Sequence, residues 1–127
     1  MISPDGKLIA CRYQPDPTKD EWKVAIILFE GGPPIQMFDI PVHPFWDKLG
    51  LRWSADGKAL TYHLHQNGID RNGIDNIWRQ PLDGGPPRQL TNFDSNQIFS
   101  FAWSRNGQLA LSRGVETRDV VLIQNFK

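Results

Sequence analysis

A five-residue turn motif recurs three times along the chain, and this repetition constrains the possible folds more than any other feature. The motif is Ser-Pro-Asp-Gly-Lys at 3–7, Ser-Ala-Asp-Gly-Lys at 54–58 and Ser-Arg-Asn-Gly-Gln at 104–108, so its serines lie 51 and 50 residues apart. A second marker, Gly-Gly-Pro-Pro, stands at 31–34 and again 53 residues later at 84–87. Asp-Gly and Asn-Gly tolerate the positive φ of a tight hairpin turn, whereas paired prolines interrupt a strand. Together the two markers predict a repeated β unit of about 50 residues.

Apolar and polar residues alternate on both sides of the central turn, as they do on half-buried strands. Leu51 and Trp53 precede the turn, and Leu60 and Tyr62 follow it. No segment has the period and the caps of a helix. The predicted strands are 7–13, 23–29 and 35–40, then 50–53, 59–65, 76–82 and 88–91, and finally 98–103, 109–112 and 120–126.

Four antiparallel strands in each unit of this length are typical of a β-propeller blade. We therefore predict an all-β chain that forms a single partial β-propeller domain over residues 1–127. The approximate blades are 1–47, 48–96 and 97–127.

The residues around the turns resemble those of a known family. Trp53 and Trp103 each precede the serine of a turn, which is similar to the Trp-Ser-Pro-Asp-Gly-Lys hairpin of TolB-like (WD-repeat-like) β-propellers. Asn-Ile-Trp at 76–78, followed by Gly-Gly-Pro-Pro-Arg-Gln-Leu-Thr at 84–91, resembles the third strand and the closing stretch of that repeat. Ile2 stands where the first repeat would carry its tryptophan.

The resemblance implies a context as well as a fold. Residues 101–126 resemble the C-terminus of large bacterial proteins in which a propeller follows a serine/threonine kinase domain or a winged-helix DNA-binding domain. This implies part of a larger bacterial signalling protein, and it suggests an extracytoplasmic or periplasmic location. The chain begins inside the turn motif, without the basic region or apolar stretch of a signal peptide, which suggests a segment of a longer protein.

The chain is too short for a complete propeller, which predicts that further blades come from elsewhere. At about 50 residues a blade, the chain supplies roughly two and a half, whereas closed propellers have about 4 to 8. Incomplete terminal blades expose strand edges and apolar faces, which favour association. Either a longer protein supplies the missing blades, or two chains form a homodimer that closes a six-bladed ring. We expect the interface of such a dimer to include Ile2, Leu8, Leu111 and residues 120–126.

The composition excludes several classes of partner. Lys and Arg number 14 and so do Asp and Glu, so the net charge is zero and no basic run marks a nucleic-acid groove. The longest apolar run, 24–29, is far shorter than the roughly 20 residues of a membrane-spanning helix. The single cysteine, Cys11, excludes an internal disulfide and a multi-cysteine metal site. We expect Cys11 to be a small buried hydrophobic residue.

No motif for catalysis or for cofactor binding is present. The chain lacks a Gly-x-Ser-x-Gly nucleophile turn, a Gly-x-Gly-x-x-Gly loop and a Walker A loop. We therefore predict no enzyme activity, no cofactor and no catalytic or metal-binding residues. His63 and His65 alternate on one predicted strand, so they share a face where they could hold a metal. Spacing fixes no third ligand, since His43 lies in a distant loop, and two ordinary half-exposed histidines are the favoured interpretation.

One lengthened loop and a few aromatic residues are the best candidates for a partner surface. Residues 66–70 and 71–75 repeat a five-residue pattern that superficially suggests a calcium loop, but the EF-hand spacing fails and a recognition loop is favoured. The tryptophans at blade positions are expected to pack between blades, whereas those in segments that do not repeat are free for recognition. The first group is Trp53, Trp78 and Trp103. The candidate ligand or partner surface is Trp22, Phe45, Trp46, His63, His65, Asp70 and Asn72.

These observations favour a non-catalytic β-propeller module for protein interaction or ligand sensing. Two alternatives stay open. The first is the gating propeller of a prolyl-oligopeptidase or tricorn-like peptidase, which requires a separate hydrolase domain. The second is a carbohydrate-binding or carbohydrate-acting propeller that uses His63 and His65 with a metal and exposed aromatic residues.

Overall fold

The computed structural model of the chain describes residues 1–41, 50–66 and 73–117, and within these ranges it contains strands and no helix. The predicted all-β class is confirmed for this part of the chain. The predicted strand at 120–126 lies outside the described residues. The strands are β1 (Leu8–Tyr13), β2 (Lys23–Leu28), β3 (Gln36–Phe38), β4 (Arg52–Trp53), β5 (Ala59–Gln66), β6 (Ile74–Pro81), β7 (Arg88–Gln89), β8 (Gln97–Trp103) and β9 (Leu109–Gly114).

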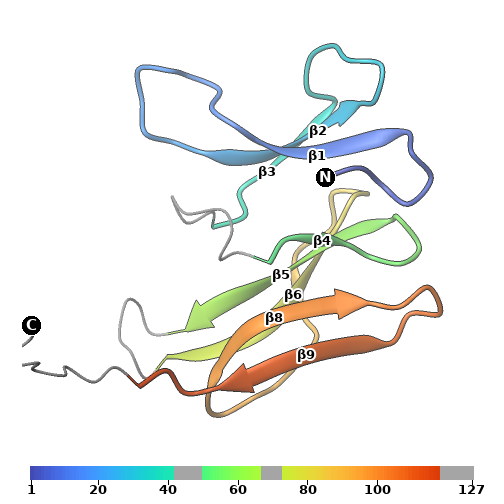
Figure 1. The fold of residues 1–127 in the computed structure, drawn as a ribbon. Helices are drawn as coiled ribbons and strands as arrows, with labels where there is room; N and C mark the ends of the chain where they lie inside the picture. The colour runs from blue at the N-terminus through green and yellow to red at the C-terminus, as the bar shows by residue number, and fades with distance from the viewer. Residues whose placement is uncertain (42–49, 67–72, 118–127) are drawn as a thin grey trace, which may run out of the picture.

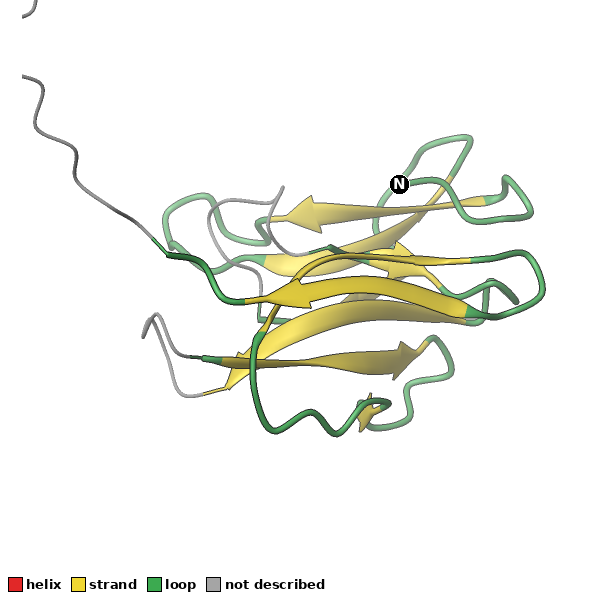
Figure 2. Cartoon of the chain, turned by 60° about the horizontal axis from the view of Figure 1, so that its bottom comes forward, coloured by secondary structure: helices red, strands yellow, loops and turns green. Residues whose placement is uncertain are grey.

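The strands form three antiparallel sheets, in each of which neighbours in sequence are neighbours in space. The first sheet has the order β1-β2-β3, the second β4-β5-β6-β7 and the third β8-β9. The sheets lie one above another in chain order, with their strands running in roughly the same direction (Figures 1 and 2). Each sheet falls within one of the three predicted sequence segments.

Two apolar cores hold the stack together, one between each pair of adjacent sheets. The first core joins the first and second sheets, and Val24, Ile26 and Leu60 are among its fully buried members. The second core joins the second and third sheets through Ile77, Ile98 and Phe101. Side chains alternate between the two faces of a strand, so the second sheet contributes one face to each core.

Two of the three repeated turns are preceded by a tryptophan, and each of these contacts the segment or sheet before it. Trp53 Nε1 donates to the carbonyl oxygen of Met1 at 3.2 Å, and Trp103 Nε1 donates to Thr61 Oγ1 at 2.8 Å. Both indoles, and that of Trp78, also pack against the apolar cores. The predicted role of these three tryptophans in core packing is confirmed, whereas the assignment of the sheets as propeller blades stays a prediction.

The repeated turns have the geometry that their sequence predicts. Gly57 and Gly107 adopt φ values of 68° and 82°, which confirms the predicted positive φ. In the central turn, Ser54 Oγ accepts from the Ala59 amide at 3.0 Å and donates to Asp56 Oδ1 at 2.5 Å. Hydrogen bonds of the Ser54 and Asp56 side chains within the motif therefore stabilise the turn.

Alanine at either glycine is expected to lower the free energy of unfolding by about 1 kcal/mol or more, because a Cβ is disfavoured at positive φ. Gly107 isolates this effect, since a Cβ there would meet no atom within 4 Å. Urea denaturation of Gly107→Ala measures it, with Gln108→Ala as a control at an exposed position in the same turn. Equal stability of the two variants would contradict the turn assignment.

The turn carboxylate also makes stability depend on pH. Hydrogen bonds from the Ser54 hydroxyl and the Lys58 amide hold the pKa of Asp56 below its ordinary value of 3.8. A carboxyl group with a lowered pKa stabilises the fold above its unfolded pKa, and this stabilisation is lost as pH falls through the folded value. Asparagine, which the third turn carries naturally at Asn106, keeps the acceptor oxygen without the charge.

In Asp56→Asn, the free energy of unfolding is therefore expected to decrease less steeply as the pH falls below about 4. Urea denaturation at a series of acidic pH values measures that slope. Asp94→Asn, which removes one exposed carboxylate outside the turns, is the matched control. An unchanged slope in Asp56→Asn would show that the turn carboxylate does not carry the acid sensitivity.

Cys11 departs from the sequence-based expectation of a buried residue. It is half-buried, and it lies opposite Ala25 in the register of β1 and β2. Its neighbours Ala10 and Val24 belong to the first core, so alternation turns Cys11 to the other face of the sheet. None of the described sheets packs on that face, which is the reason for its exposure.

Candidate functional site

The structure describes three of the seven residues that were predicted to form a partner surface. Phe45, Trp46, Asp70 and Asn72 lie outside the described residues, as does His43. The three that are described do not form one surface, because they come from different sheets. Trp22 lies in the connection between β1 and β2 of the first sheet, whereas His63 and His65 lie on β5 of the second.

Trp22 is engaged within its own sheet. The guanidinium carbon of Arg12 lies 3.5 Å from the centre of the indole ring, and Trp22 Nε1 donates to Asp20 Oδ1 at 2.9 Å. A stacked guanidinium and an indole attract each other, and the contact orders the surrounding connection. Its role in binding a partner stays a prediction.

His63 and His65 share a face of β5, as predicted, but they contact different groups. The His63 ring lies 6.3 Å from the ring of Phe101, centre to centre, in a tilted arrangement. His65 Nδ1 lies 2.5 Å from Asp75 Oδ1. Over residues 1–41, 50–66 and 73–117, no group of three or more His, Cys, Asp or Glu side chains is arranged to hold a metal ion.

Asp75 is a buried carboxylate at the point where β5, β6 and β8 meet. Its side chain is only 7% exposed, and the antiparallel register of β5 and β6 places it directly opposite His65. Oδ1 contacts the histidine, and Oδ2 accepts from the Ile98 amide at 2.8 Å. The Asp75 amide donates to the carbonyl oxygen of Asn96 at 3.2 Å. One side chain therefore joins β5, β6 and the beginning of β8.

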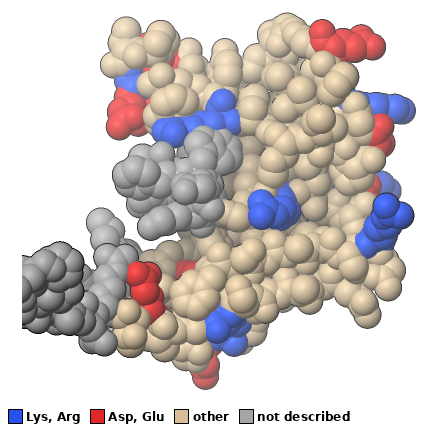
Figure 3. All heavy atoms as spheres, viewed as in Figure 1, with Lys and Arg blue, Asp and Glu red and all other residues tan. Residues whose placement is uncertain are grey.

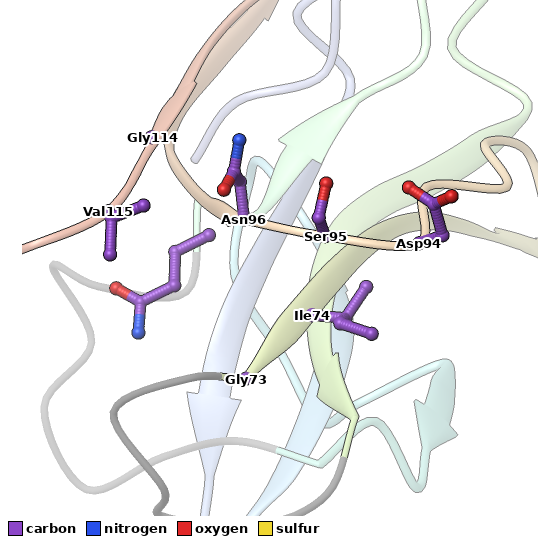
Figure 4. A pocket seen from close by; sticks show the side chains of 8 residues that line it. Gly73, Ile74, Asp94, Ser95, Asn96, Gly114 and Val115 are labelled. Atoms are coloured by element: carbon purple, nitrogen blue, oxygen red, sulfur yellow. The ribbon is translucent and has the colours of Figure 1, made fainter.

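Beside this carboxylate is a cavity of about 250 Å³ between the second and third sheets (Figure 4). It lies where β6 and β8 begin and β9 ends, which is the end of the strands opposite the turns at Gly57 and Gly107. Figure 4 shows Asp94, Ser95 and Asn96 along the connection that leads into β8. The lining residues are Gly73, Ile74, Asp94, Ser95, Asn96, Gln97, Gly114 and Val115.

Two contacts fix the connection that forms one wall of the cavity. The guanidinium of Arg113 stacks on the Phe93 ring, with its carbon 3.5 Å from the ring centre, and it donates to the carbonyl oxygen of Ser95. Asn96 adopts a positive φ of 67°, a conformation that asparagine tolerates better than most residues. The wall is therefore held by side chains and backbone of the third sheet and of its own connection.

The backbone at Gly73 forms another wall and packs against His65. A Cβ at this position would lie 1.8 Å from His65 Cε1 and Nε2, so only glycine fits here without a rearrangement. Gly73 therefore borders both His65 and the cavity, whereas His65 and Asp75 themselves do not line it. Glycine at 73 was part of the repeated loop pattern in the sequence, but its contact depends on the pairing of β5 with β6.

Of the predicted surface residues, the three that the structure describes, Trp22, His63 and His65, do not line the cavity. The signals that could have identified it are weak: a polar Asp-Ser-Asn turn at 94–96, and the glycines at the ends of β6 and β9. These features are typical of any loop. The cavity is defined by segments that are 20 or so residues apart, and only the strand register brings them together.

The charged side chains and the apolar segments of the described residues show the following distribution. On the face drawn in Figure 3, positive and negative side chains are scattered singly, without a large patch of one sign. Within the described residues, no helix has the length and apolar character needed to span a bilayer.

The cavity combines carboxylate, hydroxyl and amide groups with the apolar side chains of Ile74 and Val115. Such a lining suits a small polar ligand or a short peptide segment. No protein-family model, curated protein or solved structure matches the chain. The geometry of the cavity is therefore the basis for assigning a function.

Proposed function

We propose that the chain is a non-catalytic β-propeller module, part of a larger bacterial signalling protein, that binds a small polar ligand or a peptide segment of a protein partner. The observation that carries this proposal is the cavity between the second and third sheets, at the end of the strands away from the repeated turns. In a stack of similar sheets, the irregular connections at one end are the part that varies, and binding residues gather there.

The contacts of Asp75 favour binding over catalysis. Both carboxylate oxygens already have partners, one in His65 and one in the Ile98 amide. The side chain therefore holds β5, β6 and β8 together near the cavity. A histidine held by a carboxylate resembles two members of a catalytic triad, but no sequence motif supplies an activated nucleophile. The pair is better explained as the support of a preformed binding site, since rigid surroundings lower the entropic cost of binding.

Ligand-induced changes in the amide spectrum of the ¹⁵N-labelled chain test the proposal. The probes are acetylated tripeptides, free amino acids and oligosaccharides. We expect one of these classes to shift the amides of Gly73, Ile74, Asn96, Gly114 and Val115. Val115→Arg, which places a bulky side chain at the cavity, should weaken that binding at least about tenfold. Leu28→Arg, an exposed apolar position on the first sheet, should leave it unchanged.

Turnover assays on the same chain distinguish the alternatives. We expect no hydrolysis of p-nitrophenyl esters, peptides or oligosaccharides above the rate in buffer. Hydrolysis that persists after repurification and is lost in His65→Ala would overturn the non-catalytic assignment. Amide shifts confined to the repeated turns, or unchanged by Val115→Arg, would place the binding site elsewhere.

A further inference from the structure

The first sheet has a free apolar face whose equivalents in the other two sheets are covered. Residues directly opposite on antiparallel strands share a face, and the pairs Ile2–Ile9, Trp53–Leu60 and Trp103–Leu109 occupy the same place in the three sheets. The second and third pairs pack on the preceding sheet within this chain. The first pair has no preceding sheet in the described structure, and Ile2 is 56% exposed.

Large apolar side chains continue along this free face. Alternation from Ile9 places further residues of β1, β2 and β3 on it, since their neighbours Ala10, Val24 and Ile26 belong to the first core. Met37 is 48% exposed, and the other large residues are half-buried. The large uncharged residues of this face are Ile2, Ile9, Cys11, Tyr13, Ile27 and Met37. The same register places the fully buried Ala25 among them and Lys23 at the edge, where it pairs with Asp39.

Small residues form the free face of the third sheet. Phe101, Trp103, Leu109 and Leu111 face the second core, so alternation turns the residues between them outward. The register pairs Ser100 with Ser112 and Ala102 with Ala110, and all four are exposed. These four residues of the third sheet are small and uncharged.

The covered sheets show how such faces fit together. In each of the three pairs, the residue that follows the second member is small: Ala10 follows Ile9, Thr61 follows Leu60 and Ala110 follows Leu109. The Met1 carbonyl oxygen accepts from both the Ala10 amide and the Trp53 indole, and Thr61 accepts from the Trp103 indole. Ala10 and Thr61 are thus buried by the sheet that follows, while Ala110 stands exposed.

We propose that the free face of the first sheet binds the free face of the third sheet of a second copy of this chain. Ile2 and Ile9 then meet Ala110, as Trp53 and Leu60 meet the sheet that carries Ala10 inside the chain. A two-fold axis makes both joints at once and closes a ring of six sheets, within the range of about 4 to 8 blades. This inference rests on the proposal that the sheets are propeller blades.

The residues expected from the sequence for this interface require correction. Leu8 packs against the first core and Leu111 against the second, so both are used inside the chain. Ile2 is exposed as an interface residue must be, and 120–126 lies outside the described residues. The proposed joint therefore uses residues other than these two leucines, whose faces depend on registers that the repeat alone does not fix.

Sedimentation equilibrium of the whole chain at micromolar concentration tests the proposal, with twice the mass of 14.5 kDa expected. Met37→Lys and Ala110→Arg should each raise the dissociation constant of the dimer at least about 100-fold, because each buries an unpaired charge at a joint. Leu28→Lys, 45% exposed at the end of β2, is the matched control and should leave the dimer intact. Circular dichroism establishes that each variant is folded.

Mixing Met37→Lys with Ala110→Arg distinguishes this joint from a symmetric pairing of like faces. One joint of the mixed dimer is unaltered, so an open dimer should form at concentrations where each variant alone is monomeric. A monomeric wild-type chain, or a dimer unaffected by Ala110→Arg, would overturn the proposal. A monomer that still binds its ligand at the cavity would refute the assembly alone, whereas a dimer without cavity binding would refute the proposed binding site.

Discussion

Phe101→Ala is expected to lower the free energy of unfolding by about 3 to 5 kcal/mol, the range for removing a buried aromatic ring. The ring is 2% exposed and lies at the centre of the second core. It packs against His63 and so closely against Gly50 that a Cβ there would lie 2.9 Å from Cε1. Because both sheets contact the ring through strands that are already paired, they cannot easily close over the empty space. Urea denaturation followed by tryptophan fluorescence measures the loss.

Phe99→Ala provides a matched control on the same strand. Phe99 is 52% exposed, and exposed substitutions usually change stability by less than about 0.5 kcal/mol. The two variants remove the same atoms, so their difference reports burial alone. Similar losses in both would mean that the second core does not hold the third sheet on the second.

Asn76→Ala is expected to cost about 3 kcal/mol, through hydrogen bonds rather than packing. Asn76 is 1% exposed. Its Oδ1 accepts from the Phe93 amide at 2.7 Å and from Thr91 Oγ1 at 2.9 Å, and its Nδ2 donates to the Phe93 carbonyl oxygen at 3.1 Å. Alanine removes this partner from the partly buried amide and carbonyl groups of Phe93, and a polar group left unpaired on burial costs about 1 to 3 kcal/mol.

Hydrogen exchange at the Phe93 amide gives a second measurement of the same effect. The asparagine holds the connection from β7 to β8, so its loss should speed exchange there more than in β1 or β2. Asn92→Ala changes an exposed asparagine in the same connection and should alter neither stability nor exchange appreciably. Unchanged protection of Phe93 in Asn76→Ala would contradict the role of this side chain.

The turn residues and the alternation of apolar residues around them made the existence of the strands predictable. The exact ends of the strands depend on backbone conformation, which the repeat does not show. The alternation around Gly57 placed β5 within one residue of its observed limits. β4 begins at Arg52 instead of the predicted residue 50, because Gly50 adopts a positive φ of 50° that breaks the strand. β7 has only two residues, in keeping with the two prolines before it, which donate no backbone hydrogen bond.

The cavity and the contacts of Asp75 were less predictable, because they depend on backbone conformation and on the register of the paired strands. The duplicated loop directed attention to Asp70 and Asn72, but among the described residues the buried carboxylate is Asp75. Its importance follows from the pairing that sets it opposite His65, and from a hydrogen bond to Ile98 that spans 23 residues. The two alternating histidines suggested a binding site on β5. Only the structure shows that His63 contacts Phe101 and that His65 contacts Asp75.

The contact between each repeated tryptophan and the preceding sheet has an evolutionary consequence. Each of the two complete contacts needs only an indole before a turn and a small residue on the sheet behind it, as in Trp103 and Thr61. Both parts are encoded within one unit of about 50 residues, so tandem duplication of that unit copies the contact together with the sheet. A gene can therefore add or lose a sheet without new mutations at the joints.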